Sequence, residues 1–307
     1  MILCCGECLI DMLPRKSEEH EECFAPHAGG AVFNTAAALG RLGADAGFFS
    51  GMSNDLFGNV LADALAKSNV DYRFAKRADR PTTLAFVRLV DGHASYAFYD
   101  ENTAGRMITK ADLPTLPDDV NALFFGGISL VAEPAADAYA AFMHQEAAHR
   151  VCMIDPNIRP SFIADEPRYR ARVSSMMQSA DIIKISDEDL AWLAAGRADD
   201  DVVAELIANG TRLVCVTQGA KGINAHTAKG QIFVPATKAS VIDTVGAGDT
   251  FNAGLLHGLE QGGLLSKAAL ADIAPEDVAD AIAFGAKVAA ITVSRAGANP
   301  PWASELS

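Results

Sequence analysis

The chain is poor in positive charge. Its 307 residues include 25 lysines and arginines against 39 aspartates and glutamates, for a formal net charge of −14. This acidic balance argues against a surface that binds nucleic acid or an anionic membrane, so an anionic substrate must be bound by local groups. Half of the residues are hydrophobic, which is enough to fill a sizeable core, and long disordered stretches are not expected.

The chain also lacks the motifs of several other classes of nucleotide-using enzyme. It has no Gly-Lys dipeptide, which excludes a GxxxxGK[ST] phosphate loop, and no His-Arg-Asp triplet, which excludes a protein-kinase catalytic loop. A GxGxxG fingerprint after the first apolar run is missing as well. The sequence therefore gives no support for an NAD-dependent oxidoreductase.

The six cysteines do not form a recognisable metal set. Cys5 and Cys8 have the spacing of a metal or redox pair, but no second such pair or neighbouring histidine pair completes a zinc site. We interpret them as small buried residues with reduced thiols. Met1 leads into an apolar run only about ten residues long without a basic segment, so we expect no signal peptide or membrane anchor. These features predict a cytoplasmic protein.

Apolar runs typical of buried strands alternate with helical patterns along most of the chain. This alternation predicts an α/β fold with a mainly parallel central sheet flanked by helices on both faces, in one domain over residues 1–307. The expected strands are Ile2–Ile10, Ala46–Ser50, Ala122–Gly126, Val151–Asp155, Asp181–Ile185 and Leu213–Thr217, followed by an antiparallel pair at Gly222–His226 and Gln231–Pro235. The expected helices are Ala31–Leu42, Gly58–Ser68, Pro134–Ala148, Asp187–Ala194, Val202–Asn209, Ala247–Gln261 and Pro275–Val293.

One region departs from this alternation. Leu84–Val90 and Ala94–Phe98 alternate in hydrophobicity and are joined across Asp91-Gly92, which predicts a hairpin. We expect a small β-sheet lid contributed by approximately residues 12–28 and 70–104. Such a lid closes over a substrate and excludes water, whereas a hairpin that only extends the edge of the main sheet is the alternative.

The run Asp243–Phe251 places a loop of small residues and a carboxylate where an apolar helix begins. Gly246-Ala247-Gly248 should form the first helical turn, where N–H groups are unpaired and the helix dipole is positive. The backbone there can approach a triphosphate closely and donate to oxygens that gain charge. Asp249 would then accept a proton from a sugar hydroxyl, with an ordinary pKa, because that proton leaves late in phosphoryl transfer. The alternative is a common Gly-rich helix start.

Other polar residues follow predicted strands, at the sheet edge where open α/β proteins bind ligands. Asp11 can accept two hydrogen bonds from sugar hydroxyls, unless it caps the following turn. Gly29 and Gly30 let a polyol lie on bare backbone, and Asn34 offers both a donor and an acceptor. Arg159 brings a fixed cation whose fork suits phosphate oxygens, and a structural salt bridge is its alternative role.

Two further segments are candidates for the nucleotide and its metal ion. Lys184 ends a strand, and Ser186-Asp187-Glu188-Asp189 opens the next helix, which is typical of an ordinary N-cap followed by acidic first-turn residues. A water-mediated Mg²⁺ contact from Asp189 is the second interpretation, because Mg²⁺ keeps much of its hydration. Thr217-Gln218-Gly219-Ala220-Lys221-Gly222 lies between a buried strand and a hairpin, where it is suited to cradle a nucleotide.

Together these residues resemble the ribokinase-like, or PfkB, family of sugar kinases nearly end to end. Gly29-Gly30 with Asn34, through Gly58, resembles the family's N-terminal signature, and Asp243–Gly254 resembles its C-terminal one. The resemblance implies an α/β sandwich with a small β-sheet lid, ATP as phosphoryl donor and Mg²⁺ as the working ion. It implies that Asp249 is the catalytic base and that the N–H groups of Gly246, Ala247 and Gly248 form the anion hole. The sugar hydroxyls would be held by Asp11, Gly29, Gly30 and Asn34, and Arg159 would face the phosphates or the far end of the acceptor. The nucleotide would be bordered by Lys184, Thr217, Gly219 and Gly222.

The chain departs from the family at two ion sites. The family's Asn-x-x-Glu element appears here as Ser186-Asp187-Glu188-Asp189, so the affinity for Mg²⁺ is expected to differ. In several members carbonyl groups at positions equivalent to Asp243, Val245 and Val293–Gly297 hold a monovalent cation, together with a late hydroxyl that aligns with Pro301. Activation by K⁺ therefore stays an open expectation.

The resemblance also bears on the acceptor. Kinases of 2-keto-3-deoxygluconate often carry an arginine after an aromatic lid segment, whereas this chain has Asp100-Glu101 after Tyr99, an acidic pair that would repel a carboxylate. Three segments, Phe98–Met107, Asp155–Phe162 and Val293–Trp302, resemble bacterial fructokinases. The favoured reaction is therefore fructose to fructose 6-phosphate, with 2-keto-3-deoxygluconate, ribose or a nucleoside as alternatives. Lids in this family often pair between subunits, so a homodimer is expected.

Overall fold

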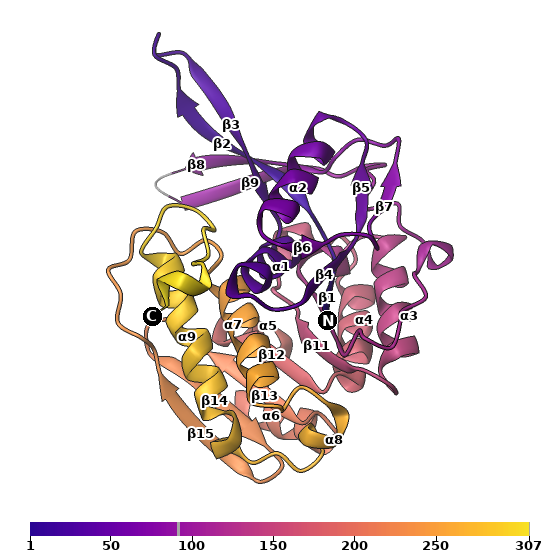
Figure 1. The fold of residues 1–307 in the computed structure, drawn as a ribbon, viewed down its shortest axis with the longest axis vertical. Coiled ribbons are helices and arrows are strands. Elements are labelled where there is room, and N and C mark those ends of the chain that lie inside the picture. The colour runs from indigo at the N-terminus through magenta and orange to yellow at the C-terminus, as the bar shows by residue number, and fades with distance from the viewer. Residues whose placement is uncertain (91–92, 307) are drawn as a thin grey trace.

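The computed structural model describes residues 1–90 and 93–306 (Figure 1). Within these residues the main sheet has nine strands in the order β15-β14-β13-β12-β11-β10-β1-β4-β6. The strands from β13 to β6 run parallel, while β14 and β15 pair antiparallel at one edge. Their bounds are β1 Ile2–Cys5, β4 Ala46–Phe49, β6 Val70–Asp71, β10 Ala122–Gly126, β11 Val151–Asp155, β12 Ile182–Ser186, β13 Leu213–Thr217, β14 Gly222–Thr227 and β15 Gly230–Pro235.

Helices cover both faces of this sheet, because side chains along each central strand alternate between two apolar clusters. In β1, Ile2 and Cys4 join one cluster and Leu3 and Cys5 join the other. The first face carries α1 Ala31–Leu42, α2 Leu56–Lys67, α7 Ala247–Gln261, α8 Lys267–Leu270 and α9 Ala279–Val293. The second face carries α3 Ala135–Glu146, α4 Glu166–Ser179, α5 Asp187–Ala194 and α6 Asp199–Ala208. Short 3₁₀ turns lie at η1 Lys110–Asp112, η2 Gly127–Leu130, η3 Pro160–Phe162, η4 Pro275–Val278 and η5 Ala303–Glu305.

Most predicted elements are confirmed, and two differences have clear physical causes. The predicted strand Ile2–Ile10 is broken at residues 6–8, because β1 belongs to the main sheet while the chain from Leu9 pairs with strands of a second sheet. Helix α4 was not predicted from the sequence, because its buried face includes a charged residue. Arg172 lies in that face and pairs with Asp137 at 3.0 Å, which hides the apolar periodicity.

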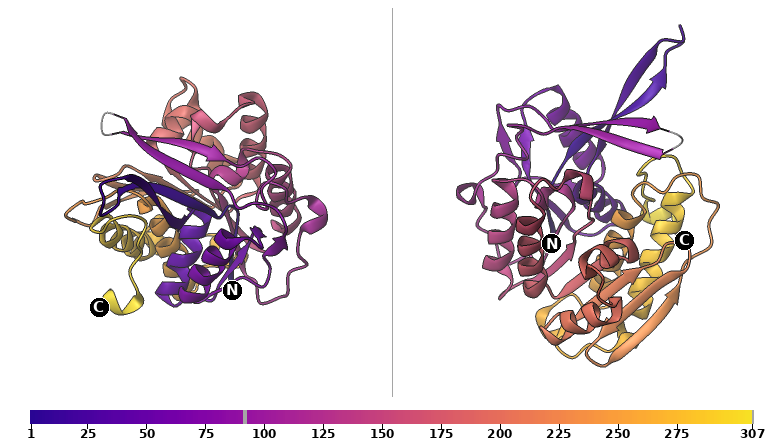
Figure 2. Two further views of the ribbon diagram at one scale, coloured as in Figure 1. Left: turned by 90° about the horizontal axis from the view of Figure 1, so that it is seen from above. Right: turned by 180° about the vertical axis from the view of Figure 1, so that it is seen from behind.

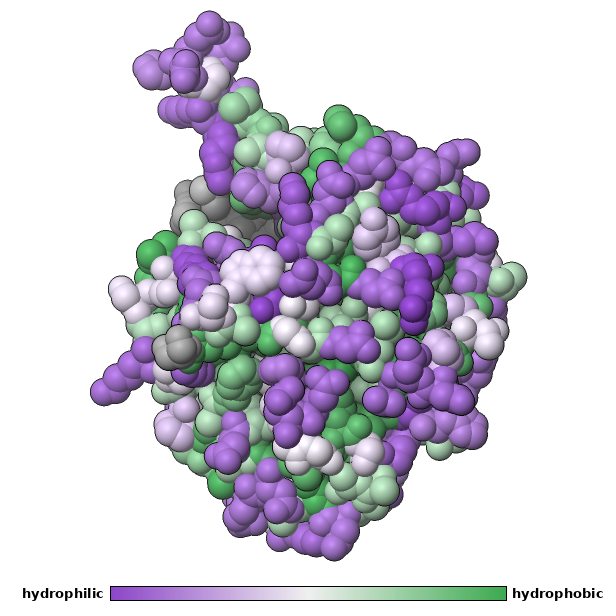
Figure 3. Space-filling view, in the orientation of Figure 1, coloured by the Kyte–Doolittle hydropathy of each residue, from purple (hydrophilic) through white to green (hydrophobic). Residues whose placement is uncertain are grey.

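The second sheet is small and has the order β3-β2-β8-β9. Its strands are β2 Leu9–Lys16, β3 Glu22–Gly29, β8 Leu84–Val90 and β9 His93–Tyr99. The β2–β3 hairpin stands out from the body (Figure 2), and its tip is hydrophilic (Figure 3). The predicted turn Asp91-Gly92 lies outside the described residues.

Only part of the range 70–104 belongs to this small sheet. Strand β6 pairs with β4 in the main sheet, and β7 Lys76–Ala78 pairs with β5 Gly51–Ser53. The contribution of this range to the small sheet is therefore β8 and β9. Among the described residues, no helix combines the length and apolar character needed to cross a membrane.

Close helix packing sets the position of α7. A Cβ on Gly254 would lie 2.6 Å from the Cα of Gly285, and one on Gly258 would lie 2.7 Å from the Cα of Ala281. These glycines let α7 and α9 approach backbone to backbone, as Figure 1 shows. The packing helps fix the start of α7 near the carboxyl ends of β11 and β12.

Candidate active site

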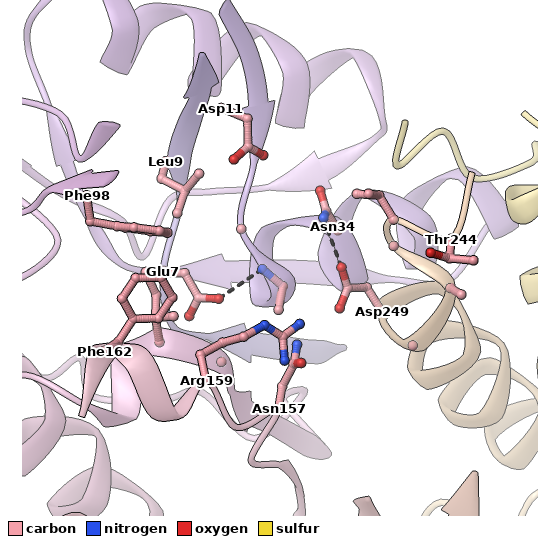
Figure 4. Close-up of a pocket in the computed structure, with 18 residues that line it drawn as sticks. Glu7, Leu9, Asp11, Asn34, Phe98, Asn157, Arg159, Phe162, Thr244 and Asp249 are labelled. Carbon is pink, nitrogen blue, oxygen red and sulfur yellow. Dashed lines mark hydrogen bonds between the residues drawn. The ribbon is translucent and has the colours of Figure 1, made fainter. Parts of the chain in front are cut away.

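A cavity of about 340 Å³ lies between the main sheet, the small sheet and the start of α7 (Figure 4). Its walls contain nine of the residues predicted from sequence: Asp11, Gly30, Asn34, Arg159, Val245, Gly246, Ala247, Gly248 and Asp249. They come from segments as far apart in sequence as β2 and α7. Glu7, Leu9, Ala31, Phe98, Gly127, Ile128, Asn157, Phe162 and Thr244 also line it and were not predicted.

The turn that opens α7 presents backbone N–H groups to this cavity. Gly246 is the N-cap with φ of 78°, and a Cβ there would lie 2.7 Å from the Cβ of Ala298. Within the described part of the chain, the N–H groups of Gly246 and Gly248 have no hydrogen-bond acceptor. The N–H of Ala247 points to the carbonyl of Thr244 at 3.3 Å, a long bond. Two of the three predicted donors are thus uncommitted.

Asp249 is buried beside this turn. Its Oδ2 accepts a hydrogen bond from Asn34 Nδ2 at 2.9 Å, and its carbonyl accepts one from Thr35 Oγ1 at 3.1 Å. Burial raises the pKa of Asp249 to about 7, although the bond from Asn34 lowers it. The expectation of an ordinary carboxylate pKa was therefore wrong, because sequence does not show how completely α1 and α7 enclose the side chain.

Lys184 lies behind the turn rather than at the surface. Its Nζ donates to Asp155 Oδ2 at 2.9 Å, and Asn252 Nδ2 donates to the same oxygen at 2.7 Å. A Cβ on Gly248 would be 3.0 Å from that Nζ, so the ammonium group is next to the N–H groups of the turn. Asn252 is one helical turn beyond Asp249, and the network therefore ties α7 to the ends of β11 and β12.

Asp11 and Gly29 form a matched pair on β2 and β3. A Cβ on Gly29 would lie 2.3 Å from Asp11 Oδ2, so the missing side chain makes room for the carboxylate. Burial raises the pKa of Asp11 to about 6. Gly29 does not line the cavity, whereas Gly30 does, with φ of 109°.

Arg159 and two aromatic rings close another side of the cavity. Arg159 Nη1 donates to the carbonyl of Ile158 at 3.0 Å, and its guanidinium points into the cavity (Figure 4). Phe98 of the small sheet packs edge-to-face against Phe162 of the body, with centroids 4.3 Å apart. The aromatic residues of the lid segment were the available signal for Phe98, but its partner could not be known without the fold.

The remaining predicted nucleotide residues lie outside this cavity. Thr217 ends β13, and Gly219 has φ of 53° with open space around it. A Cβ on Gly222 would lie 2.4 Å from the carbonyl oxygen of Val234, so this glycine is needed for the β14–β15 pairing. Thr217, Gly219 and Gly222 therefore lie together at the end of the sheet, and none of them lines the cavity.

The predicted ion-site residues are engaged in local hydrogen bonds. Asp189 N donates to Ser186 Oγ at 3.0 Å, which confirms the N-cap, and Asp189 Oδ2 accepts from Ile158 N at 3.2 Å. Burial is the main cause that raises the pKa of Asp189 to about 6. Asp243 accepts from the N–H groups of Val245 and Gly297, at 3.0 and 2.8 Å.

Asp100 does not line the main cavity. Its Oδ1 accepts hydrogen bonds from Thr83 Oγ1 at 2.7 Å and Thr103 Oγ1 at 2.9 Å. It borders a smaller neighbouring cavity together with Arg106, a cation that was not predicted from the sequence. Repulsion of a substrate carboxylate by Asp100 and Glu101 therefore does not by itself decide whether the acceptor is a neutral sugar or a sugar acid.

The fold and the site define a class. A mainly parallel sheet, a small second sheet and an amide turn beside a buried carboxylate are the architecture of ribokinase-like sugar kinases. The family described as pfkB family carbohydrate kinase matches residues 1–305, and the chain belongs to this family.

Individual relatives agree with this assignment. The chain is 52% identical to a fructokinase of Rhizobium leguminosarum bv. trifolii over 273 residues, covering 89% of this chain and 84% of the relative. It is 35% identical to fructokinase-2 of Zea mays, covering 83% and 79%. Among solved structures, the ATP-bound fructokinase of Xylella fastidiosa has a TM-score of 0.92 at 30% identity, covering 99% of this chain and 96% of that one. The fructokinase of Vibrio cholerae O395 with fructose, ADP and calcium has a TM-score of 0.83 at 26% identity, covering 97% and 94%.

Proposed function

We propose that the protein is an ATP-dependent fructokinase that transfers the γ-phosphoryl group of ATP to the 6-hydroxyl of fructose. The observation that carries this proposal is one cavity that holds both a buried carboxylate, Asp249, and the free N–H groups of Gly246 and Gly248. The fructokinase names of the relatives support the choice of fructose.

The polar walls suit a neutral polyol at one end of the cavity. Asp11 offers two acceptor oxygens and Asn34 both a donor and an acceptor, while Gly30 presents bare backbone. Asp249 accepts the proton of the attacking hydroxyl, and Asn34 holds its carboxylate in place at 2.9 Å. Arg159 points into the same cavity, where its guanidinium binds phosphate oxygens or the far end of the acceptor.

The amide turn binds the oxygens of the transferring phosphoryl group. The N–H groups of Gly246 and Gly248 donate to oxygens that gain charge, with Ala247 as the third donor once its long bond to Thr244 is released. Lys184, next to Gly248, adds positive charge behind the turn. We assign the border of the nucleotide to Thr217, Gly219 and Gly222.

Magnesium fits this site as an ion that arrives with the nucleotide. Among residues 1–90 and 93–306, no three histidine, cysteine or acidic side chains converge as ready-made ligands. When bound with the nucleotide, Mg²⁺ would neutralise charge on the phosphate groups. Asp189 would contact its water shell, because a buried carboxylate in the first turn of α5 is a suitable acceptor for bound water. For K⁺, carbonyl groups near Asp243 and Val245 are the candidates.

A substrate panel tests the proposed function. ADP release is measured with fructose, 2-keto-3-deoxygluconate, ribose and adenosine, and we expect clear preference for fructose. With 1-deoxyfructose turnover should persist, whereas 6-deoxyfructose should bind without being phosphorylated, because it lacks the attacking hydroxyl. A clear preference for another acceptor would reject fructose as the substrate.

The pH dependence of turnover should report the enclosed base. Because Asp249 must be ionised to accept a proton and burial raises its pKa to about 7, kcat/KM for fructose should fall below about pH 7 and level off above it. Replacing Asn34 by alanine removes a donor that favours the ionised form, so the acid limb should move to higher pH. An acid limb near pH 4 in the wild type would contradict the raised pKa, because an aspartate base with an ordinary pKa titrates there.

We further propose that the small sheet is a lid. Phe98 lines the cavity and packs on Phe162 of the body, so closure over fructose would strengthen this contact. Hydrogen exchange in β8 and β9 should slow when fructose binds, while exchange in α6, which contributes no residue to the lining of either cavity, stays the same. Unchanged exchange in β8 and β9 would favour a static sheet edge.

We also propose a cytoplasmic homodimer. Phe24 of β3 is 44% exposed and packs edge-to-face against Phe86, which leaves an apolar surface on the small sheet that a second subunit would cover. Unpaired thiols are in keeping with a reducing compartment. Light scattering measures the mass in solution, and a Phe24→Ser variant should shift the mass from dimer to monomer.

A further inference from the structure

Glu7 is a buried acidic residue in the break between β1 and β2. Its Oε1 accepts hydrogen bonds from the N–H groups of Ala31 at 2.9 Å and Val32 at 3.4 Å. Its Oε2 accepts one from the N–H of Ser129 at 3.2 Å. The carboxylate therefore joins the start of α1 to η2, two segments far apart in sequence, and Figure 4 shows its bond to α1 beside the cavity.

The start of α1 depends on this outside acceptor. Its N-cap is Gly30, which has no side chain to accept from the first N–H groups, and the first turn contains no acidic residue. A negative charge at a helix N-terminus is favourable. Glu7 thus performs from a neighbouring segment the capping that serine or aspartate usually performs locally.

The surroundings of Glu7 are shaped to receive its carboxylate. Gly127 has φ of 67°, and a Cβ there would lie 2.1 Å from Glu7 Oε1. Gly30 has φ of 109°, and a Cβ there would lie 3.1 Å from Glu7 Cγ. Two glycines in the left-handed region therefore enclose one glutamate, and both also line the cavity.

We propose that Glu7 is a positioning residue that holds two walls of the acceptor site, Gly30–Ala31 of α1 and Gly127–Ile128 of η2, at a fixed separation. The proposal rests on the acceptor site assigned above. It extends to the catalytic base, because Asn34 N donates to the carbonyl of Gly30 at 2.8 Å and the Asn34 side chain holds Asp249. Glu7 acts on the reaction through these segments.

The test is the variant Glu7→Gln, which keeps the shape but turns one acceptor oxygen into a donor that faces a backbone N–H. We expect the KM for fructose to rise about tenfold or more, while the KM for ATP stays within about twofold. The matched control is Glu146→Gln. Glu146 is also buried and pairs with Arg150, away from the cavity, so its loss should lower the melting temperature and leave both KM values unchanged.

Gly127→Ala provides a second route to the same effect if Glu7→Gln does not fold. The new methyl group would displace the Glu7 carboxylate, so the KM for fructose should again rise selectively. The double variant should be little worse than either single one, because both remove the same bridge. Equal changes in the two KM values, or a loss of stability alone as in Glu146→Gln, would overturn the proposal. If the substrate panel selects another acceptor, the same comparison is made with that acceptor, so failure of the fructose assignment is distinguished from failure of the role of Glu7.

Discussion

Replacing Asp249 by asparagine should lower kcat by about 10²- to 10⁴-fold, the range expected when a general base is lost. The amide has nearly the same shape and can still accept the hydrogen bond from Asn34, so fructose should bind with little change in affinity. Rapid-quench kinetics measure the phosphoryl step, and calorimetry measures fructose binding. A selective loss of kcat identifies a group that acts in the transition state.

The same variant should be more stable than the wild type in mildly alkaline solution. Burial raises the pKa of Asp249 to about 7 in the folded protein, from an ordinary value near 3.8. The folded state therefore binds more protons than the unfolded state between these values, and this group makes the protein less stable as the pH rises through that window. Asparagine has no such charge, so the melting temperature of Asp249→Asn should exceed that of the wild type at pH 8.

Asp181→Asn is the matched control for this variant. Asp181 is another buried aspartate, but it precedes β12, accepts from Cys152 N and pairs with Lys267 at 2.7 Å, away from the cavity. Its substitution should lower stability and leave kcat within about twofold. Near-normal turnover of Asp249→Asn, with fructose still bound, would remove Asp249 from its role as base.

Replacing Gly246 by alanine should lower kcat by about 10²- to 10³-fold, the cost of losing a preorganised donor to a developing anion. Alanine is strained at a φ of 78°, and its Cβ would lie 2.7 Å from the Cβ of Ala298. The turn must therefore move, and the N–H groups of Gly246 and Gly248 would no longer converge. Steady-state kinetics with fructose and ATP measure the effect.

Gly263→Ala separates this effect from backbone strain. Gly263 has φ of 70°, but a Cβ there has open space around it, and it follows the far end of α7. Both variants should lose about 1 to 2 kcal/mol of unfolding free energy from the strained backbone. Only Gly246→Ala should lose turnover, and an equal loss in the two variants would mean that the amide turn has no special part in the reaction.

The sequence predicted much of the fold because the buried strands are short apolar runs with clear ends. Strands β10, β11 and β13 and helices α1, α5 and α7 have the predicted bounds. The cavity residues at the start of α7 were predictable because a helix start without bulky side chains exposes its N–H groups, and the carboxylate of Asp249 follows directly in the sequence. A local sequence pattern was sufficient to predict a functional feature that depends on the backbone of a single segment.

Features that depend on tertiary contacts were not predictable in this way. Glu7 stood between two cysteines interpreted as core residues, and only the fold brings it to the N–H groups of Ala31 and Ser129. Lys184 was expected to border the nucleotide, while its bond to Asp155 depends on two parallel strands lying side by side. The raised pKa of Asp249 likewise depends on burial between α1 and α7.

A crystal structure with fructose and a non-hydrolysable ATP analogue tests the central claim most directly. The account predicts the 6-hydroxyl of fructose within hydrogen-bond distance of Asp249 and the terminal phosphate on the N–H groups of Gly246 and Gly248. A closed complex in which that hydroxyl faces another side chain, with the terminal phosphate away from the turn, would contradict it.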